Sequence, residues 1–245
     1  STGLWIEDLS ARDAAPPVQL TPKGWNVNSP AFSPDNRTVY FLSAKSGSSQ
    51  LYSIPAAGGT PTQLTSLPLD VDAFLLSPDG ARVALAMGAY PDCTTDLACT
   101  RKRLDDTAAR KASGVVFDRI FIRHWDTWAD GRLNRLFVAP LGATPATTAT
   151  LVGGDVLGDM PSKPFGDMSD VAWSPDGASL VASVRLSNAQ EPTSTNFDLY
   201  RFAADGSGSA RNLTAANAAW DAGPVFSADG RTLYYRAMKR PGFEA

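Results

Sequence analysis

Histidine and cysteine are scarce in this chain, and their scarcity bounds the chemistry that we expect. Among 245 residues there are one histidine, His124, and two cysteines, Cys93 and Cys99. This falls short of the usual tetrahedral ligand set of a zinc site, so we expect no metal and no cofactor. The cysteines lie close together in PDCTTDLACT, where a disulfide is sterically allowed and two unpaired thiols are the alternative.

Long apolar runs and charge of one sign are also missing. No apolar run approaches the roughly 18 residues that a membrane span needs, and the first residues, STGLWIEDL, do not resemble a signal peptide. The formal net charge is only -3. We therefore expect neither a membrane nor a nucleic acid as a partner. A hydrophobic content of 43% is enough for a globular protein with a proper core.

What the chain does have is an internal repeat built around a tight turn. The copies are AFSPDNRTVYFLSA (31–44), FLLSPDGARVALAM (74–87), VAWSPDGASLVASV (171–184) and PVFSADGRTLYYRA (224–237). In each copy an apolar strand is predicted to return through the turn into an alternating strand. Aspartate caps the turn and glycine takes its positive φ, with Asn36 as the next best residue for that conformation.

A second motif alternates with the first and completes a repeating unit. Its copies are LWIEDL (4–9), LYSIPA (51–56), LFVAPL (136–141) and LYRFAA (199–204), and QLT or NLT follows three of them, ending at Thr21, Thr65 and Thr214. Four antiparallel strands per repeat indicate an all-β fold, a β-propeller of four-stranded blades. We predict a partial propeller over 1–245, with about three complete blades (29–65, 71–152 and 170–214) and a half blade at each end.

The middle blade carries an insertion of roughly 40 residues, at 88–133, because 59 residues separate Ser77 from Leu136 where 18 separate Ser33 from Leu51. Its first half, 97–112, predicts a short exposed helix that stops near Gly114. Antiparallel connectivity puts the SPDG turns on one face. The insertion, the loops 153–169 and 187–196, and the terminal 239–245 share the other face, where we expect the function.

Two catalytic interpretations of this loop-rich face are weak. A serine nucleophile on a strained turn is not indicated, because Gly-x-Ser-x-Gly does not occur in the chain. The aspartates Asp155, Asp159, Asp167 and Asp170 cluster in sequence, but their spacing matches no calcium loop. We therefore assign no catalytic residue and no metal ligand in this chain.

The stretch FIRHWDTWADGR (121–132) admits two interpretations. In one, the tryptophans anchor the insertion onto the blades and Arg123 pairs with Asp126. In the other, an amphipathic patch contacts a ligand or another domain, since Trp and Arg concentrate at interface hot spots. The candidate substrate or interdomain contact residues on this face are Arg123, His124, Trp125, Asp126, Trp128, Glu191, Arg240 and Glu244.

Several segments give the chain a resemblance to a known family. The run VVFDRIFIRHWDTWADGRLNRLFVAPL (115–141), with YPDCTTDLACTRKR (90–103), SKPFGD and AMKRPGFEA, resembles the propeller of prolyl oligopeptidase family (S9) serine peptidases. The bacterial dipeptidyl peptidase V and acylaminoacyl peptidase branch is the most similar. The resemblance implies a propeller that gates and positions short peptides for a carboxy-terminal α/β-hydrolase domain, which is absent from this chain and would supply the catalytic triad.

The same resemblance sets the remaining expectations. It implies a serine exopeptidase of the periplasm or extracellular space, whose partners are its own hydrolase domain and short peptides, and it leaves a homodimer open. Glu191, Glu244 or Asp126 would hold the substrate's amino group. The alternative is a non-catalytic, TolB-like propeller that binds proteins through the same SPDG blades.

Overall fold

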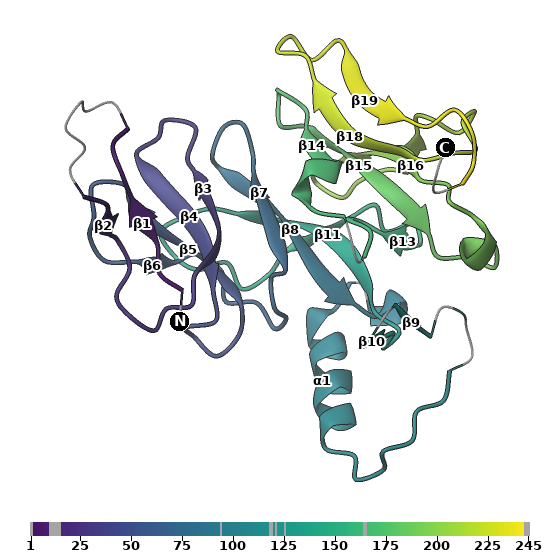
Figure 1. The fold of residues 1–245 in the computed structure, drawn as a ribbon, viewed down its shortest axis with the longest axis horizontal. Helices are drawn as coiled ribbons and strands as arrows, with labels where there is room; N and C mark the ends of the chain where they lie inside the picture. Colours follow the sequence, from purple (N-terminus) through teal and green to yellow (C-terminus); the bar gives the residue numbers. More distant parts are fainter. Residues whose placement is uncertain are drawn as a thin grey trace.

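The computed structural model describes residues 2–9, 16–93, 95–117, 120, 122–124, 126–163 and 166–242. Its strands form three large antiparallel sheets, flanked by a strand pair at each end of the chain (Figure 1). Strand order follows the sequence in the first two sheets. The first contains β3 (Asn28–Phe32), β4 (Thr38–Ser43), β5 (Gln50–Pro55) and β6 (Thr62–Gln63). The second contains β7 (Ala73–Leu76), β8 (Arg82–Ala89), β11 (Leu133–Pro140) and β12 (Thr150–Val152).

The third sheet has one strand more than the repeat predicts. Its four repeat strands are β14 (Val171–Trp173), β15 (Ser179–Leu186), β16 (Asp198–Ala203) and β17 (Arg211–Asn212). The loop 153–169 adds β13 (Gly158–Asp159), which pairs with the far end of β15. The outer pairs are β1 (Trp5–Ile6) with β2 (Val18–Gln19), and β18 (Asp221–Phe226) with β19 (Leu233–Ala237). These are the propeller sheets that the repeats predict; the number of blades in a complete ring stays a prediction.

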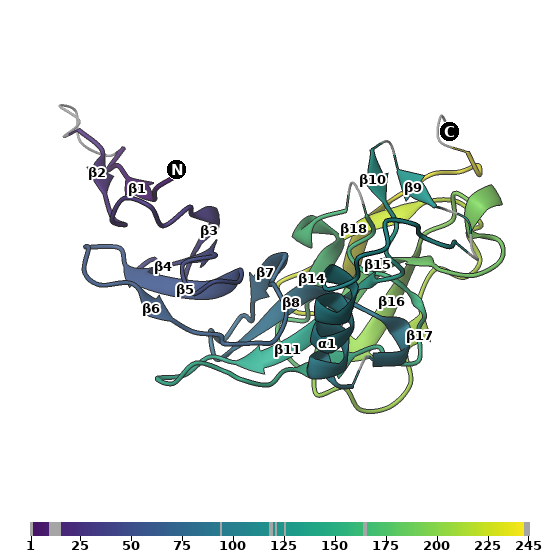
Figure 2. The ribbon, with the colours of Figure 1, turned by 90° about the horizontal axis from the view of Figure 1, so that it is seen from below.

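The hydrophobic core lies between successive sheets rather than in one centre. One cluster joins the first strand pair to the first sheet, a second joins the first and second sheets through Leu51 and Leu85, and a third joins the second and third through Leu136 and Leu180. Trp173 reinforces the last junction, because its indole N–H donates to Leu75 O across the sheets at 3.1 Å. The first and second sheets therefore bury both of their faces against neighbours, as the blades of a propeller do; Figure 2 shows the sheets following one another along the chain.

The repeated turn is closed by its serine and aspartate. Ser174 Oγ donates to Asp176 Oδ1 at 2.5 Å and accepts from Ser179 N at 2.9 Å, and the same contacts recur at Ser33, Ser77 and Ser227. The position after the aspartate has positive φ in every copy, 58° at Asn36 and 66° at Gly177. The prediction that asparagine replaces glycine there is confirmed.

The threonine of the QLT and NLT motifs closes the other side of the repeat. Thr65 Oγ1 accepts a hydrogen bond from Leu51 N at 2.9 Å, and Thr21 and Thr214 accept from Leu4 N and Leu199 N at the same distance. In the second sheet Val152 lies opposite Leu136, so this sheet lacks the threonine contact. The segment TATLV (148–152) is followed by Gly153, so this copy has no threonine at the position of Thr65.

The insertion leaves the second sheet at the end of β8 and returns at the start of β11. It contains a 3-10 turn (Pro91–Cys93), helix α1 (Leu97–Ala108), and the strands β9 (Arg123–His124) and β10 (Thr127–Trp128). The helix begins where predicted, because Asp96 Oδ1 accepts from Ala98 N at 2.9 Å. It ends at Ala108, before Gly114; its buried residues, Leu97 and Thr100, lie near its start, and its later turns are held by partly buried Leu104 and two surface ion pairs.

Candidate functional site

The tip of the insertion is a short β-hairpin with an aromatic surface. Thr127 pairs with His124, and Ala129 N donates to Ile122 O at 2.9 Å. The Trp128 ring stacks on Phe117 at 5.6 Å between centroids, and the Arg123 guanidinium lies 5.7 Å from the same ring. Trp128 remains 58% exposed. Its ring packs on the insertion's own Phe117, and the interpretation that the tryptophans anchor the insertion onto the blades stays a prediction.

The structure describes the other residues of the predicted patch only in part. Asp126 lies exposed in the hairpin turn. Trp125 and the side chain of His124 lie outside the described residues. Apolar side chains leading into the hairpin add to its exposed surface, with exposed fractions from 40% to 95% at Ile122, Ile120, Val115 and Val116. The described part of this segment thus presents several exposed apolar side chains beside the Arg123 guanidinium, which is the composition of a contact surface.

The base of the insertion is held firmly to the second sheet. Cys93 and Cys99 form a disulfide, which decides between the two alternatives left open by the sequence. Arg103 makes two hydrogen bonds to Asp92, at 2.6 and 3.0 Å, and its guanidinium lies 4.4 Å from the Tyr90 ring centroid. Helix α1 therefore provides a fixed support from which the hairpin segment projects.

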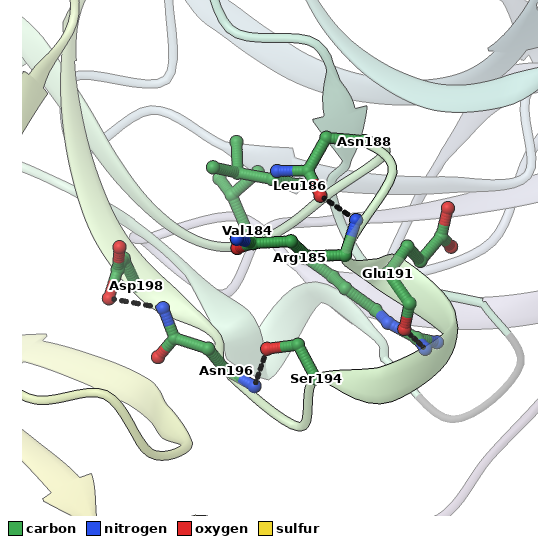
Figure 3. A pocket seen from close by; sticks show the side chains of 9 residues that line it. Val184, Arg185, Leu186, Asn188, Glu191, Ser194, Asn196 and Asp198 are labelled. Carbon is green, nitrogen blue, oxygen red and sulfur yellow. Dashed lines mark hydrogen bonds between the residues drawn. The ribbon is translucent and has the colours of Figure 1, made fainter.

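Glu191 lies on the neighbouring loop, above the third sheet, at the first position of a 3-10 turn (Glu191–Thr193). Its carbonyl accepts from Arg185 Nη2 at 3.1 Å, and its carboxylate accepts from Ser187 Oγ at 3.2 Å. A polar cavity of about 60 Å³ lies beneath it, lined by Arg185, Asn196 and Asp198 among others. Figure 3 shows the Glu191 carboxylate directed away from Ser194 and Asn196, and Glu191 is half-buried.

The terminal segment meets the same loop, since Gly242 N donates to Thr195 Oγ1 at 2.7 Å. Arg240 is exposed on this segment, and Glu244 lies outside the described residues. None of the hairpin residues that the structure describes lines the cavity near Glu191. The predicted residues therefore lie on at least two separate loops, and the structure gathers them into no single pocket.

Asp159 is a residue that sequence reasoning considered as a calcium ligand or as a general acid or base. Its carboxylate accepts from Asn134 N at 2.7 Å, so it joins the start of β11 to β13. Burial raises the pKa of Asp159 to about 6; the Asn134 hydrogen bond and the Lys163 charge oppose this rise, and the Glu191 charge adds to it. The strand β13 lies in a loop rich in Gly, Pro and Asp, so its pairing with β15 could not be recognised from composition.

The other aspartates of 153–170 serve separate structural contacts. Asp155 accepts from Ala210 N, Asp167 caps a 3-10 turn through Ser169 N, and Asp170 accepts from Gly223 N. Within the residues that the structure describes, no group of three or more histidine, cysteine or acidic side chains could hold a metal ion. Similarly, no helix in the described part of the chain has the length and apolar content of a membrane span.

Comparisons with known proteins agree with this architecture. Residues 4–88 match a family model described as the dipeptidyl peptidase IV N-terminal region. The chain is 30% identical over 220 residues to dipeptidyl-peptidase 5 of Porphyromonas endodontalis, which covers 89% of this chain and 30% of that protein. It is 29% identical over 233 residues to dipeptidyl-peptidase 5 of Porphyromonas gingivalis, covering 93% of this chain and 32% of that protein.

Solved structures show the same fold at low sequence identity. The Pyrococcus horikoshii acylaminoacyl peptidase aligns with a TM-score of 0.54 and 12% identity, over 85% of this chain and 27% of that one. A putative TolB from Agrobacterium tumefaciens aligns with a TM-score of 0.50 and 17% identity, over 96% of this chain and 63% of that one. At these identities the likeness establishes the fold alone.

Sheets, repeats and relatives together define a β-propeller of the type that peptidases carry. The chain resembles the propeller region of dipeptidyl peptidases, through the family model over residues 4–88 and the dipeptidyl-peptidase 5 relatives. It spans about a third of the length of the dipeptidyl-peptidase 5 relatives that it matches.

Proposed function

We propose that this propeller gates and positions short peptides for a serine exopeptidase whose chemistry comes from a carboxy-terminal α/β-hydrolase domain beyond this chain. The observation that carries the proposal is the 30% identity to a dipeptidyl-peptidase 5 over 89% of the chain. The propeller face that carries the insertion and the 187–196 loop is the surface we assign to that domain and its substrate.

Two loops on this face have the chemistry that the role needs. The hairpin offers Trp128, Arg123 and a run of exposed apolar side chains, which suit a protein or peptide contact. The neighbouring loop offers the Glu191 carboxylate, which suits a peptide's protonated amino group. Asp126, exposed in the hairpin turn, and Glu244 are the other acids that we assign to this role.

Release of dipeptides is favoured over release of acylated amino acids. The sequence relatives are dipeptidyl peptidases, whereas the acylaminoacyl peptidase is similar in fold at only 12% identity. A non-catalytic TolB-like role is the second candidate, favoured only by the 96% of this chain that aligns with the putative TolB.

A decisive experiment uses the complete encoded polypeptide. Labelling with a fluorophosphonate would report an activated serine, and dipeptidyl anilides with free or acetylated amino termini would separate the two peptidase activities. We expect labelling and cleavage of the free dipeptidyl anilide. A polypeptide that ends near Ala245, with no labelling and no cleavage, would favour the TolB-like role instead.

The amino-group contact is tested by neutralising the three acids singly. Glu191→Gln, Asp126→Asn and Glu244→Gln are compared in the complete enzyme, with Asp155→Asn as a control on a different loop. We expect one of the three to raise the Michaelis constant for dipeptidyl anilides about tenfold, since a charge-assisted hydrogen bond contributes roughly 1.5–3 kcal/mol. Unchanged constants in all three would exclude this form of anchoring.

We also propose a periplasmic or extracellular location, because disulfides persist in oxidising compartments and Cys93 and Cys99 are paired. Fractionation of cells that express the native gene, with thiol labelling of both cysteines, tests the location. A cytoplasmic protein with free thiols would contradict it. A homodimer of the complete protein is a separate proposal that light scattering would decide.

A further inference from the structure

Two cationic side chains converge on one glycine at the end of β8. Gly88 lies opposite Asn134 of β11, beside the base of the insertion. A Cβ atom placed on Gly88 would lie 3.5 Å from Arg132 Nη1 and also 3.5 Å from Lys163 Nζ. The two nitrogens therefore lie no farther apart than the sum of these distances, although like charges repel each other.

Both nitrogens keep hydrogen-bonding capacity. Arg132 contacts Asp130 Oδ2 through Nε at 2.7 Å and Nη2 at 2.6 Å, which leaves Nη1 without an acceptor among the described residues. Lys163 is exposed, and its ammonium has no ion pair or hydrogen bond within the described part of the chain. Arg132 Nη1 and Lys163 Nζ, which belong to two different loops, are thus both available to donate hydrogen bonds beside Gly88.

Gly88 is not required by its backbone conformation. It is absent from the glycines with positive φ, and it lies inside a strand, where glycine is less stable than alanine by about 0.5–1 kcal/mol. Glycine inside a strand often marks the close approach of a ligand or another backbone. Here the missing side chain leaves space between the two cations.

Three acids neighbour the two cations: Asp130 pairs with Arg132, and the Lys163 charge acts on Asp130, Asp159 and Asp72. The atoms nearest to a Cβ on Gly88 nevertheless belong to Arg132 and Lys163. Burial raises the pKa of Asp72, at the start of β7, and the charges of Lys163 and Arg132 oppose that rise. Asp72 forms no ion pair with either cation in the described structure. Its charge would limit the affinity for an anion, which suits a site that must release its ligand.

We propose that Arg132 Nη1 and Lys163 Nζ form a carboxylate-binding site over Gly88, and that its ligand is the C-terminal carboxylate of a short peptide substrate. A carboxylate can bridge the two cations with one oxygen on each nitrogen. The choice of a peptide terminus rests on the proposed exopeptidase function. The site would then select substrates by length, because only a short peptide can place its terminus there.

The test uses the complete enzyme and pairs of tripeptides and tetrapeptides that end in a free carboxylate or an amide. The readout is the ratio of kcat/KM for acid over amide. We expect a ratio of about five in the native enzyme, which corresponds to roughly 1 kcal/mol. Lys163→Gln, Arg132→Gln and Gly88→Ala should bring it close to one, whereas Lys111→Gln, an exposed lysine in the insertion, should leave it unchanged.

A binding measurement separates this inference from the proposed function. Tripeptides whose scissile bond is reduced to a methylene-amine cannot be hydrolysed, and calorimetry can compare their acid and amide forms. Tighter binding of the acid, lost in Lys163→Gln, supports the site even if the enzyme cleaves nothing. Efficient cleavage with equal constants for acid and amide overturns the site and leaves the exopeptidase function standing. A peptide with an acidic side chain and an amide terminus shows whether any carboxylate suffices.

Discussion

Asn134 donates its backbone N–H to the carboxylate of Asp159 at 2.7 Å, and this bond joins the base of the insertion to the loop that carries β13. Asn134 also donates its side-chain amide to Pro161 O at 3.0 Å, so both ends of this residue hold the same loop. A partly buried carboxylate thus adds a polar contact to the apolar junction between the second and third sheets.

The titration of Asp159 predicts how stability depends on pH. Because burial raises its pKa from 3.8 to about 6, the folded protein binds the proton more tightly than the unfolded chain does. Its contribution to the free energy of unfolding is fully present below pH 4 and is lost as the pH rises to about 6. The loss amounts to about 3 kcal/mol at most.

Asp159→Asn should therefore flatten the stability profile between pH 4 and 6. Urea unfolding across this range measures the effect. Asp155→Asn, in the same loop but with no such burial, is the matched control and should keep the native slope. Equal slopes in the native protein and in Asp159→Asn would contradict the assignment.

The serine of the repeated turn should matter more inside a complete sheet than at its end. Ser174 is 4% exposed and its hydroxyl holds Ser179 and Asp176. Ser174→Ala should lower the free energy of unfolding by about 1–3 kcal/mol, because it leaves buried polar groups without partners. Ser227→Ala, which removes the same contacts from an exposed turn, should lower it by less than about 1 kcal/mol. Denaturant titration of both variants decides; an equal loss would contradict this reasoning.

The Cys93–Cys99 disulfide should stabilise the insertion locally. It closes a short loop, so its removal in a Cys93→Ser, Cys99→Ser double variant should cost about 2 kcal/mol. The Arg103–Asp92 pair and the Tyr90 N–H bond to Thr100 remain to hold α1. Hydrogen exchange should therefore increase across 90–108 and stay unchanged in β14–β16. Faster exchange in all sheets would show that the disulfide supports the whole fold.

Trp128 should affect activity far more than stability. Because its ring is 58% exposed, Trp128→Ala should change the free energy of unfolding by less than about 1 kcal/mol. In the complete enzyme we expect kcat/KM to fall severalfold, since exposed tryptophans at contact surfaces often carry much of the binding energy. Trp5→Ala, at an equally exposed tryptophan of the first strand pair, is the control and should leave kcat/KM unchanged.

The sheets were predicted well from the sequence, because the residues that specify each turn lie close together and recur in every repeat. Asp35, Asp79, Asp176 and Asp229 cap their own turns, so each copy of the motif specifies the same geometry from residues two or three positions apart. The helix was predicted from its run of helix-forming residues, and the structure adds an N-cap at Asp96. Its end was misplaced, because tertiary burial near Leu97 and Thr100, rather than propensity, determines how far it extends.

The site was less predictable because its contacts link distant segments. Nothing near Asp159 in sequence indicates that it meets Asn134, and nothing near Gly88 indicates Arg132 and Lys163. A single glycine in a strand or a single aspartate in a loop has the composition of ordinary structure. By contrast, Trp128 and Arg123 are close in sequence, so a contact patch could be proposed from the sequence as one of two interpretations, although the packing of Trp128 on Phe117 was not foreseen.

The threonine that accepts from Leu51 N lies 14 residues further along the chain, and the serine and aspartate of the turn close over even shorter distances. A growing polypeptide could therefore form these contacts as soon as each repeat leaves the ribosome, before the next one exists. The second sheet is the exception, because its third strand, β11, is synthesised only after the whole insertion, and its fourth strand, β12, lacks the threonine. During synthesis the second sheet should therefore remain incomplete for longer than the others. Its strands β7 and β8 would already be paired, with their apolar faces uncovered until β11 emerges.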